Sequence, residues 1–401
     1  MNTRQKVLIS GAGIGGLTAG LALIRRGFDV EIYEQATAIA EVGAGVQISS
    51  NGTRVLHALG LGDDVRRVAW EPEGKVVRLW STGKTWKLFD LSSESVSRYG
   101  FPYLMFHRSD LIGILLDAVR QAAPQALRLG HKVIDVQQNS SGVTLRFQNR
   151  ESASGDVLIG ADGIHSTIRQ ALFGKDKASV TGLMAWRGVI SAAALPAHLL
   201  QPVGANWVGP GRHVIQYRLR QGTMVNFVGI VERDDVMEES WSSEGTREEC
   251  AADFKNWHND IHTMIRNITR PFKWPLMTRE PMESWSAGRT TLLGDACHAT
   301  LPFLAQGAVM ALEDGYIVAD CLGTFDDAET ALKTYERLRH TRTAAVMRGS
   351  AANAKRFHNP DLAEQASAEA YIEREWQPEK IRERYEWLFS YDATKAVSGA
   401  A

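Results

Sequence analysis

Cysteine is scarce in this sequence, and the few cysteines present stand far apart. Among 401 residues there are only three, Cys250, Cys297 and Cys321, with no Cys-x-x-Cys pair and no Cys/His spacing of a zinc ligand set. This usage indicates neither a disulfide framework nor a zinc site. It fits a reducing cytoplasm, so we expect a cytoplasmic protein.

The sequence also lacks long hydrophobic runs and an excess of charge of either sign. No stretch reaches the roughly 18 to 20 apolar residues that a membrane span needs, and the N-terminus has no signal-peptide pattern. The formal net charge is −1, whereas a protein that binds nucleic-acid phosphates carries a strongly basic balance or face. We therefore expect a soluble protein with neither a membrane nor a nucleic acid as partner.

Glycine, in contrast, is concentrated in a motif near the N-terminus. The β-branched run 6–10 predicts a buried parallel strand, and the segment GAGIGG at 11–16 follows it directly. Helical spacing continues to a basic turn before Gly27, and the segment 29–34 predicts a second strand. Strand, glycines, helix and strand in this order are typical of a dinucleotide-binding unit.

The individual residues of this unit suit a dinucleotide. Gly11 permits the tight turn, Gly13 lets a pyrophosphate approach the backbone, and Gly16 lets the helix pack closely on the strand. Glu34, at the end of the second strand, can accept hydrogen bonds from a ribose 2′-hydroxyl. The unit by itself does not separate a flavin from a nicotinamide nucleotide.

Two later segments repeat the pattern of a strand that ends in glycine and aspartate. The first reaches Asp162 and Gly163, and the second reaches Gly294 and Asp295. In a doubly wound sheet, ligands bind at the carboxyl ends of the strands, so we expect both segments at the same crevice as the glycine motif. Their carboxylates can bind ribose hydroxyls, and their glycines allow a close backbone approach.

Together these motifs resemble a known family, the single-component FAD-dependent aromatic hydroxylases. GAGIGG, GADGIHSTIR and LLGDACH stand in the family's order, and they are followed by Pro302 and by a segment that contains Gly307. The resemblance runs from about residue 6 to residue 391. The sequence has no second GxGxxG and no redox Cys-x-x-Cys, which argues against a pyridine-nucleotide disulfide reductase.

The resemblance implies an enzyme with FAD as its prosthetic group and with NADH or NADPH and O2 as co-substrates. In this family, reduced flavin and O2 form a C4a-hydroperoxide that hydroxylates a phenolic ring. We expect a small aromatic acid as substrate, such as the monohydroxybenzoates 3-hydroxybenzoate or salicylate, and a monomer or homodimer. The alternatives are a 6-hydroxynicotinate-type or larger polycyclic phenol hydroxylase, a flavin oxidoreductase that inserts no oxygen, and an inactive flavin-binding protein.

The resemblance also implies roles for the cofactor-binding residues. Glu34 would hold the adenosine ribose of FAD, Arg108 would lie near the pyrophosphate or ribityl chain, and Asp295 would bind the ribityl or pyrophosphate region. Asp162 and Gly163 would serve both FAD and the passing nicotinamide nucleotide. The full set expected to bind the cofactor is Gly11, Gly13, Gly16, Glu34, Arg108, Asp162, Gly163, Gly294, Asp295 and Gly307.

The implied fold is α/β, with a Rossmann-like FAD-binding domain of the para-hydroxybenzoate hydroxylase type, an inserted and mostly antiparallel substrate domain, and a C-terminal helical region. Alternation at 185–190, 213–219 and 224–231 predicts antiparallel strands of the inserted sheet, with a hairpin turn at 220–222. We expect this sheet to cover the flavin, with the substrate between them. The expected boundaries are 1–70, 101–180 and 286–340 for the FAD-binding domain, 71–100 and 181–285 for the substrate domain, and 341–401 for the helical region.

His213 and Tyr217 are the candidate catalytic residues. They stand four positions apart on a predicted strand, so they share one face, a spacing that the polar edge of an ordinary strand shows equally well. Their segment resembles a strand of the 3-hydroxybenzoate and 6-hydroxynicotinate enzymes in which a His and a Tyr act on the substrate. The resemblance implies that His213 removes the phenolic proton and that Tyr217 orients the hydroxyl or relays its proton. Gln47 and Pro302 are implied to line the substrate pocket beside the flavin.

Overall fold

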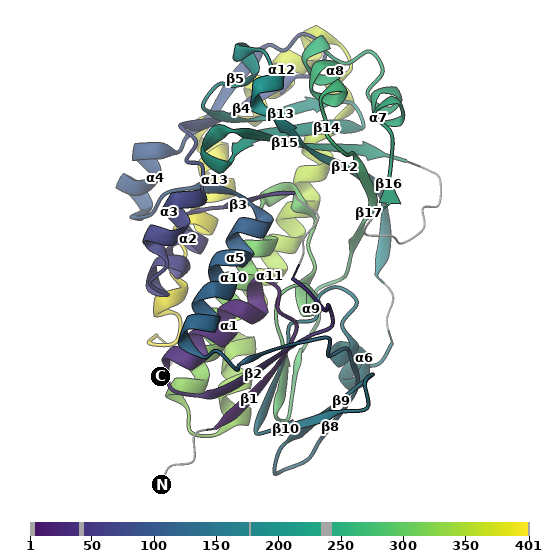
Figure 1. Cartoon of the computed structure of the whole chain (residues 1–401). Helices are drawn as coiled ribbons and strands as arrows, with labels where there is room; N and C mark the ends of the chain where they lie inside the picture. The colour runs from purple at the N-terminus through teal and green to yellow at the C-terminus, as the bar shows by residue number, and fades with distance from the viewer. Residues whose placement is uncertain (1–4, 40–43, 176–177, 234–242, 400–401) are drawn as a thin grey trace.

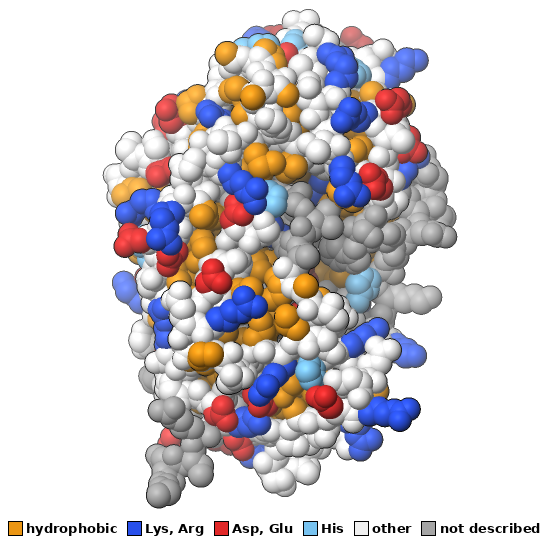
Figure 2. Space-filling view, in the orientation of Figure 1, with side chains coloured by type: hydrophobic (Ala, Val, Ile, Leu, Met, Phe, Trp, Pro, Cys, Tyr) orange, Lys and Arg blue, Asp and Glu red, His pale blue; other side chains and the backbone are white. Residues whose placement is uncertain are grey.

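The computed structural model describes residues 5–39, 44–175, 178–233 and 243–399. Two large sheets lie toward opposite ends of the molecule, and long helices span the distance between them (Figure 1). On the face shown in Figure 2, acidic and basic side chains are interspersed, as expected for a net charge of −1. Among the described residues, no helix combines the length and the apolar character needed to cross a membrane.

The lower sheet has a parallel core built from the N-terminal motif. β1 (Lys6–Ser10) pairs in parallel with β2 (Asp29–Glu34) on one side and with β11 (Val157–Gly160) on the other. Both predicted N-terminal strands are confirmed, and the burial of β1 and β11 explains why they consist of unbroken apolar runs. The six strands lie in the order β18 (Ser286–Ala287), β19 (Thr290–Leu292), β11, β1, β2 and β7 (Leu127–Leu129).

Long helices pack beside this sheet and against one another, namely α1 (Ile14–Arg25), α5 (Arg108–Ala122), α10 (Gly307–Thr324) and α11 (Ala328–Phe357). α1 crosses α10 closely because Gly315 has no side chain, and a Cβ there would lie 2.7 Å from Ala19 N. α11 is one continuous helix, so the boundary expected at residue 341 is wrong. The helix-forming residues after 341 continue a helix that begins at residue 328, and no proline interrupts it.

The upper sheet contains the inserted strands that the alternation predicted. β15 (Met224–Glu232) pairs antiparallel with both β12 (Ser179–Ser191) and β14 (Arg212–Leu219), and a turn at Arg220–Gly222 joins β14 to β15. These strands and the turn are confirmed. The eight strands lie in the order β16 (Ser243–Glu244), β17 (Phe272–Thr278), β12, β15, β14, β13 (Val203–Gly209), β4 (Gly74–Leu79) and β5 (Thr85–Asp90).

A two-stranded ribbon places two expected site residues between the sheets. β3 (Gly45–Ile48) carries Gln47 and pairs with β6 (Leu104–His107), and α5 begins at Arg108 directly after β6. The remaining strands, β8 (Val133–Gln138), β9 (Val143–Phe147) and β10 (Ser152–Gly155), form a small antiparallel sheet. The other helices are α2 (Ser50–Ala58), α3 (Gly62–Val68), α4 (Ser92–Tyr99), α6 (Thr167–Phe173), α7 (Arg247–Asp253), α8 (Asn259–Arg266), α9 (Asp295–His298), α12 (Gln365–Glu375) and α13 (Pro378–Phe389).

A cluster of charged side chains is buried where α10 meets α11. Arg339 of α11 lies 2.7 Å from both Glu313 and Asp314 of α10, and all three side chains are fully buried. Asp314 Oδ2 also accepts the Gly294 N–H and lies 2.6 Å from His298 Nε2. Burial alone would raise the pKa of Asp314, but His298 and Arg339 lower it to about 2. The cluster therefore fixes the turn at Gly294 relative to α10.

We expect Arg339→Met to lower the free energy of unfolding by about 3–5 kcal/mol, because it leaves Glu313 and Asp314 buried without their shared cation. Arg337→Met, at an exposed position of the same helix, is the control and should change it by no more than about 0.5 kcal/mol. Urea unfolding followed by circular dichroism measures both. Equal changes in the free energy of unfolding would show that the buried cluster stabilises the fold no more than an exposed arginine does.

Candidate active site

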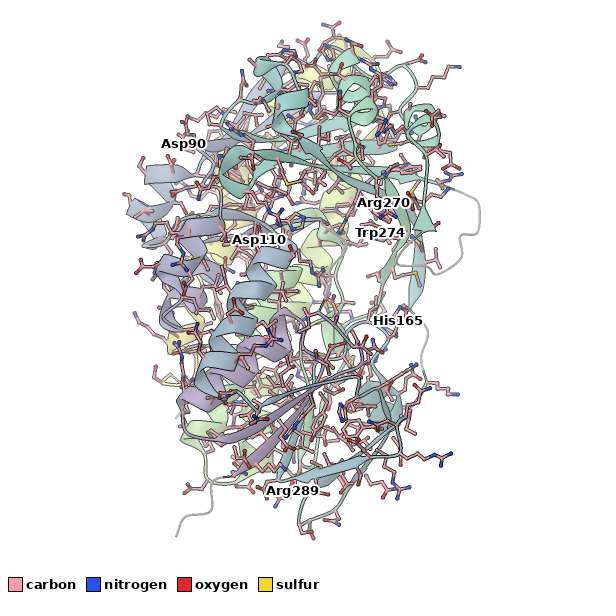
Figure 3. The ribbon with its side chains drawn as sticks, viewed as in Figure 1. Asp90, Asp110, His165, Arg270, Trp274 and Arg289 are labelled. Carbon is pink, nitrogen blue, oxygen red and sulfur yellow. The ribbon has the colours of Figure 1, made fainter. Side chains whose placement is uncertain are left out.

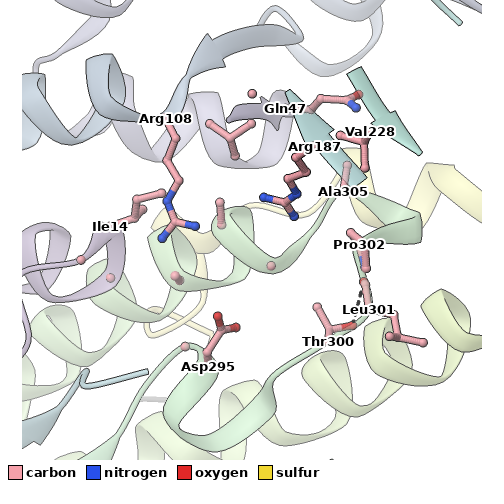
Figure 4. A pocket seen from close by; sticks show the side chains of 18 of the residues that line it. Ile14, Gln47, Arg108, Arg187, Val228, Asp295, Thr300, Leu301, Pro302 and Ala305 are labelled. Atoms are coloured by element: carbon pink, nitrogen blue, oxygen red, sulfur yellow. Dashed lines mark hydrogen bonds between the residues drawn. The ribbon is translucent and has the colours of Figure 1, made fainter. Parts of the chain in front are cut away.

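A cavity of about 270 Å³ lies between the two sheets (Figure 4). The upper sheet supplies one wall, and the glycine motif, the turn at Gly294 and the N-terminus of α10 supply the other. Small-molecule sites measure roughly 300–1,000 Å³, so the cavity suits a compact ligand and not a polymer. A second cavity of about 150 Å³ adjoins it and shares Arg108, Arg187, Asp295 and Pro302 with it.

Most of the residues expected from the sequence line the first cavity, although they come from distant parts of the chain. Those that line it are Gly13, Gln47, Arg108, His213, Tyr217, Gly294, Asp295, Pro302 and Gly307. Gly11 and Gly16 form the turn beside it, and Glu34 ends the neighbouring strand. Asp162 and Gly163 line neither of the two cavities.

The glycine motif has the shape of a phosphate cradle. Gly11 has a φ of +105°, and a Cβ there would lie 2.4 Å from Ala161 O; a Cβ on Gly16 would lie 2.0 Å from Gly11 O. Both positions therefore require glycine for the turn to close. A Cβ on Gly13 would instead meet no atom within 4 Å. It would project into the open space at the start of α1, where free backbone N–H groups can bind a pyrophosphate.

Two of the expected carboxylates lie at the end of β2 and at the start of α9. Glu34 Oε2 accepts the Ala12 N–H at 2.9 Å, which ties the end of β2 to the glycine motif. The exposed surface of Asp295 faces the cavities that it lines. Desolvation by the surrounding protein raises the pKa of Asp295, against the opposing effect of Arg108. Figure 4 shows the Asp295 and Arg108 side chains pointing into the cavity from opposite sides.

Asp162 has a local structural task that the sequence did not suggest. Its Oδ1 accepts the Ser166 hydroxyl hydrogen at 2.5 Å, and its Oδ2 accepts the N–H groups of Thr167 and Ile168 at 2.8 and 3.2 Å. The carboxylate thus caps the N-terminus of α6. The expected contact of Asp162 with a cofactor stays a prediction beside this structural role. An aspartate that follows a strand can cap the next helix as well as bind a ligand.

The wall supplied by the upper sheet is built from alternate residues of two neighbouring strands. His213, Ile215 and Tyr217 of β14 all line the cavity, as do Val228 and Ile230 of β15. His213 lies directly opposite Ile230 in the ladder, and Ile215 lies opposite Val228. The prediction that His213 and Tyr217 share a face is therefore confirmed, because side chains alternate along a strand.

His213 presents one nitrogen without a protein partner. Its Nδ1 lies 2.6 Å from His358 Nε2, whereas its buried Nε2 has no hydrogen-bond partner among the described residues. The ring is wholly inaccessible to solvent and packs against Phe303 and Phe357. Burial, together with the neighbouring His358, holds the pKa of His213 well below its ordinary value. His213 is therefore neutral at pH 7 and can accept a proton.

Tyr217 ends a chain of hydrogen bonds that starts at Lys75. Lys75 Nζ donates to Tyr103 Oη at 2.9 Å, and Tyr103 Oη donates to Gln47 Oε1 at 2.8 Å. Gln47 also hydrogen-bonds to Tyr217, and since its oxygen is occupied it does so through its amide N–H. Burial raises the pKa of Tyr217. Tyr217 therefore keeps its hydroxyl hydrogen and can donate it into the cavity.

Arg187 is a candidate that the sequence analysis missed. It lines both cavities from β12, its Nε has no hydrogen-bond partner in the described part of the chain, and its guanidinium lies 4.1 Å from the centre of the Trp274 ring. Burial lowers its pKa to about 10, so it remains a cation at neutral pH. The signal in the sequence was a charged residue in the middle of an apolar strand.

The second cavity lies next to the first. His165 lines it from the turn before α6, and Trp274 lines it from β17. Figure 3 shows these two side chains along the same edge of the molecule. Because Arg187 and Pro302 line both cavities, a ligand in one cavity contacts residues that also face the other.

Similar proteins match this chain over most of its length. Residues 4–350 match the FAD binding domain family. A 3-amino-4-hydroxybenzoate 2-monooxygenase of Streptomyces platensis is 35% identical, over 99% of this chain and 98% of its own. A 3-hydroxybenzoate 6-hydroxylase of Polaromonas naphthalenivorans is 33% identical, over 98% of this chain and 97% of its own. A solved salicylate hydroxylase substrate complex superposes with a TM-score of 0.82 at 25% identity, covering 100% of this chain and 99% of the other.

The chain belongs to the FAD-dependent aromatic hydroxylases. FAD is its prosthetic group, and NADH or NADPH is the co-substrate typical of this family. The open cradle at Gly13 and the carboxylates of Glu34 and Asp295 fit the pyrophosphate and hydroxyl groups of FAD. The α/β fold expected from the sequence, with its inserted antiparallel sheet, is confirmed.

We expect Gly13→Ala to weaken FAD binding at least about tenfold, which corresponds to about 1.4 kcal/mol, because the methyl group enters the phosphate cradle. The fold should survive, since that methyl group meets no protein atom within 4 Å. Gly113→Ala in α5 is the control, because its Cβ also meets nothing within 4 Å and it does not line the cavity. Titration of the apoprotein with FAD, followed by flavin fluorescence, gives both affinities. Wild-type affinity in Gly13→Ala would contradict the assigned cradle.

Proposed function

We propose that the protein hydroxylates a small aromatic acid that carries a ring hydroxyl, such as the monohydroxybenzoates 3-hydroxybenzoate or salicylate. For a substrate that keeps its carboxylate, the reaction converts the acid, NAD(P)H, O2 and a proton into the hydroxylated acid, NAD(P)+ and water. One observation carries the proposal. His213, whose Nε2 has no hydrogen-bond partner among the described residues, lines the same cavity as Tyr217 and Arg187.

The neutral His213 suits the removal of a phenolic proton. A phenolate is a stronger ring nucleophile than a phenol, so a base within reach of the hydroxyl promotes hydroxylation. His213 is buried, and the cavity wall around it is formed by apolar residues of β14 and β15, which limits competition by water. Tyr217 donates a hydrogen bond, so it suits an oxygen that is or becomes negative.

Arg187 suits the carboxylate of the substrate. Arg187 is half-buried, and its buried Nε has no hydrogen-bond partner among the described residues. A buried N–H without a partner is unfavourable unless an acceptor approaches it, and a carboxylate can accept two parallel bonds from a guanidinium. Arg187 and Tyr217 line the same cavity, and the positive charge of Arg187 acts on Tyr217. We therefore assign the carboxylate to Arg187 and the ring hydroxyl to His213 and Tyr217.

FAD would occupy the wall opposite these three residues. We assign its pyrophosphate to the cradle at Gly13, its adenosine ribose to Glu34, and its ribityl region to Asp295 and Arg108. Bound FAD supplies the electrons from NAD(P)H and the activation of O2. Pro302 lines both cavities at the start of a short 3-10 helix, and Pro302 and Gln47 would flank the substrate ring.

The other functions considered from the sequence fit this cavity less well. A hydroxynicotinate presents the same hydroxyl and carboxylate, so it remains the second candidate. A polycyclic phenol without a carboxylate would leave Arg187 without an anion. A flavin oxidoreductase that inserts no oxygen would give the base at His213 no role.

The direct test is turnover with a panel of aromatic acids under 18O2. The panel holds 3-hydroxybenzoate, salicylate, 3-amino-4-hydroxybenzoate and 6-hydroxynicotinate, with benzoate as the control that lacks the hydroxyl. We expect at least one phenolic acid to accelerate NADH or NADPH oxidation and to yield a product with one 18O atom, and benzoate to yield none. Acceleration by no phenolic acid, or H2O2 as the sole product with all of them, would contradict the proposal.

We expect Arg187→Gln to raise KM for the best phenolic acid by about 10- to 100-fold, the loss of a charged hydrogen bond of about 1.5–3 kcal/mol. The matched substrate is the primary amide of the same acid, which has no charge for Arg187 to bind. The KM for the amide should change less than about twofold, which corresponds to about 0.4 kcal/mol. The reason is that a hydrogen bond to a neutral group contributes less than one between charged groups. Steady-state kinetics with both compounds measures these changes in KM. An equal rise in KM for acid and amide would contradict the assignment of the carboxylate to Arg187.

A further inference from the structure

His213 is the inner end of a row of three hydrogen-bonded side chains that reaches the protein surface. His213 Nδ1 lies 2.6 Å from His358 Nε2, and His358 Nδ1 lies 2.8 Å from Glu232 Oε1. His213 has no accessible surface, the His358 side chain is 2% exposed, and the Glu232 side chain is 58% exposed. The row therefore connects the cavity wall to bulk water through two buried imidazole rings.

The backbone holds these residues in register. His358 is the C-cap of α11, and Glu232 is the last residue of β15. Gly211 N–H donates to His358 O at 3.3 Å, and Glu232 N–H donates to Gly211 O at 3.0 Å. Gly211 thus links both outer residues to the start of β14, the strand that carries His213. Three elements distant in sequence meet at this point.

The carboxylate at the outer end determines the protonation of both rings. A carboxylate only accepts hydrogen bonds, so Glu232 requires the proton of His358 on Nδ1. Burial lowers the pKa of His358, although Glu232 opposes this, and the ring is neutral with Nε2 as an acceptor. His213 must then donate through Nδ1 to His358, which leaves a lone pair on His213 Nε2. The row therefore prepares that nitrogen as a base.

We propose that His358 and Glu232 form a proton relay that carries the phenolic proton of the substrate from His213 to solvent. This inference rests on the proposed function, because it needs a substrate hydroxyl at His213. The substrate O–H bond breaks as an N–H bond forms at His213 Nε2, and the His213 Nδ1 proton moves to His358 Nε2. The His358 Nδ1 proton then passes to Glu232 Oε1 and on to water. Both rings end neutral in the opposite tautomer, and the reverse transfer returns a proton to the product.

The other polar chain at the cavity does not provide this path. It runs from Lys75 through Tyr103 to Gln47 and Tyr217. Gln47 interrupts it, because an amide forms hydrogen bonds but does not readily take up and release a proton. Burial also raises the pKa of both Tyr103 and Tyr217. This chain orients a donor, whereas the His213 row supplies the base.

The test compares Glu232→Gln, His358→Gln and the double variant with wild type, all as the FAD-loaded enzyme. Glu364→Gln is the control, because Glu364 is an exposed carboxylate that precedes α12 and lies outside the row. Each protein is assayed with the best phenolic acid and with a ring-fluorinated analogue whose hydroxyl ionises more easily. A relay predicts a larger loss with the parent acid, since its proton is harder to remove. A purely structural role predicts the same loss with both.

We expect each single variant to lower kcat for the parent acid about 10- to 100-fold, within the contribution of general base catalysis, while KM changes less than about twofold. The double variant should be no slower than the slower single variant, because residues that act in series are not additive. Wild-type kcat in both single variants, or equal losses with parent and fluorinated acids, would overturn the relay. Failure of wild type and Glu364→Gln to hydroxylate any phenolic acid would instead overturn the proposed function, and the relay with it.

Discussion

The buried ion cluster between α10 and α11 holds one wall of the cavity in place. Asp314 accepts the Gly294 N–H, so the turn that presents Asp295 to the cavity is tied to a carboxylate that cannot leave its buried cation without a large cost. Glu313 next to it accepts a hydrogen bond from Asn51 Nδ2 at 2.8 Å, which ties α2 to the same cluster. The wall that would bind FAD thus takes its shape from charges that do not line the cavity.

The two walls of the cavity offer different kinds of chemical groups. The lower wall offers backbone N–H groups, glycines and carboxylates, which suit phosphates and sugar hydroxyls. The wall from the upper sheet offers one acceptor at His213, one donor at Tyr217 and one cation at Arg187. Each of these three groups has an electrostatic requirement that a phenolic acid meets. A site of this kind discriminates by the groups that a wrong ligand leaves unpaired.

The features that the sequence predicts correctly are those that depend on residues close together in the chain. β1, β2 and β14 follow from local patterns, and the shared face of His213 and Tyr217 follows from the two-residue period of a strand. His358 could not be found in this way, because it lies 145 residues from His213 and a single histidine at a helix end has no periodic signal. The capping role of Asp162 could not be predicted, because a helix cap and a ligand-binding acid have the same sequence pattern. Arg187 could have been found, since a charge inside an apolar strand needs an explanation.

The proposed function requires a phenolic acid to bind with its hydroxyl at His213 and to lose its proton there. The most direct measurement is the ultraviolet difference spectrum of the bound acid at neutral pH, recorded with wild type and with His213→Gln. We expect the absorption of the phenolate on wild type and that of the neutral phenol on the variant, with both proteins binding the acid. The same neutral spectrum on both proteins, or a phenolate on His213→Gln, would contradict it.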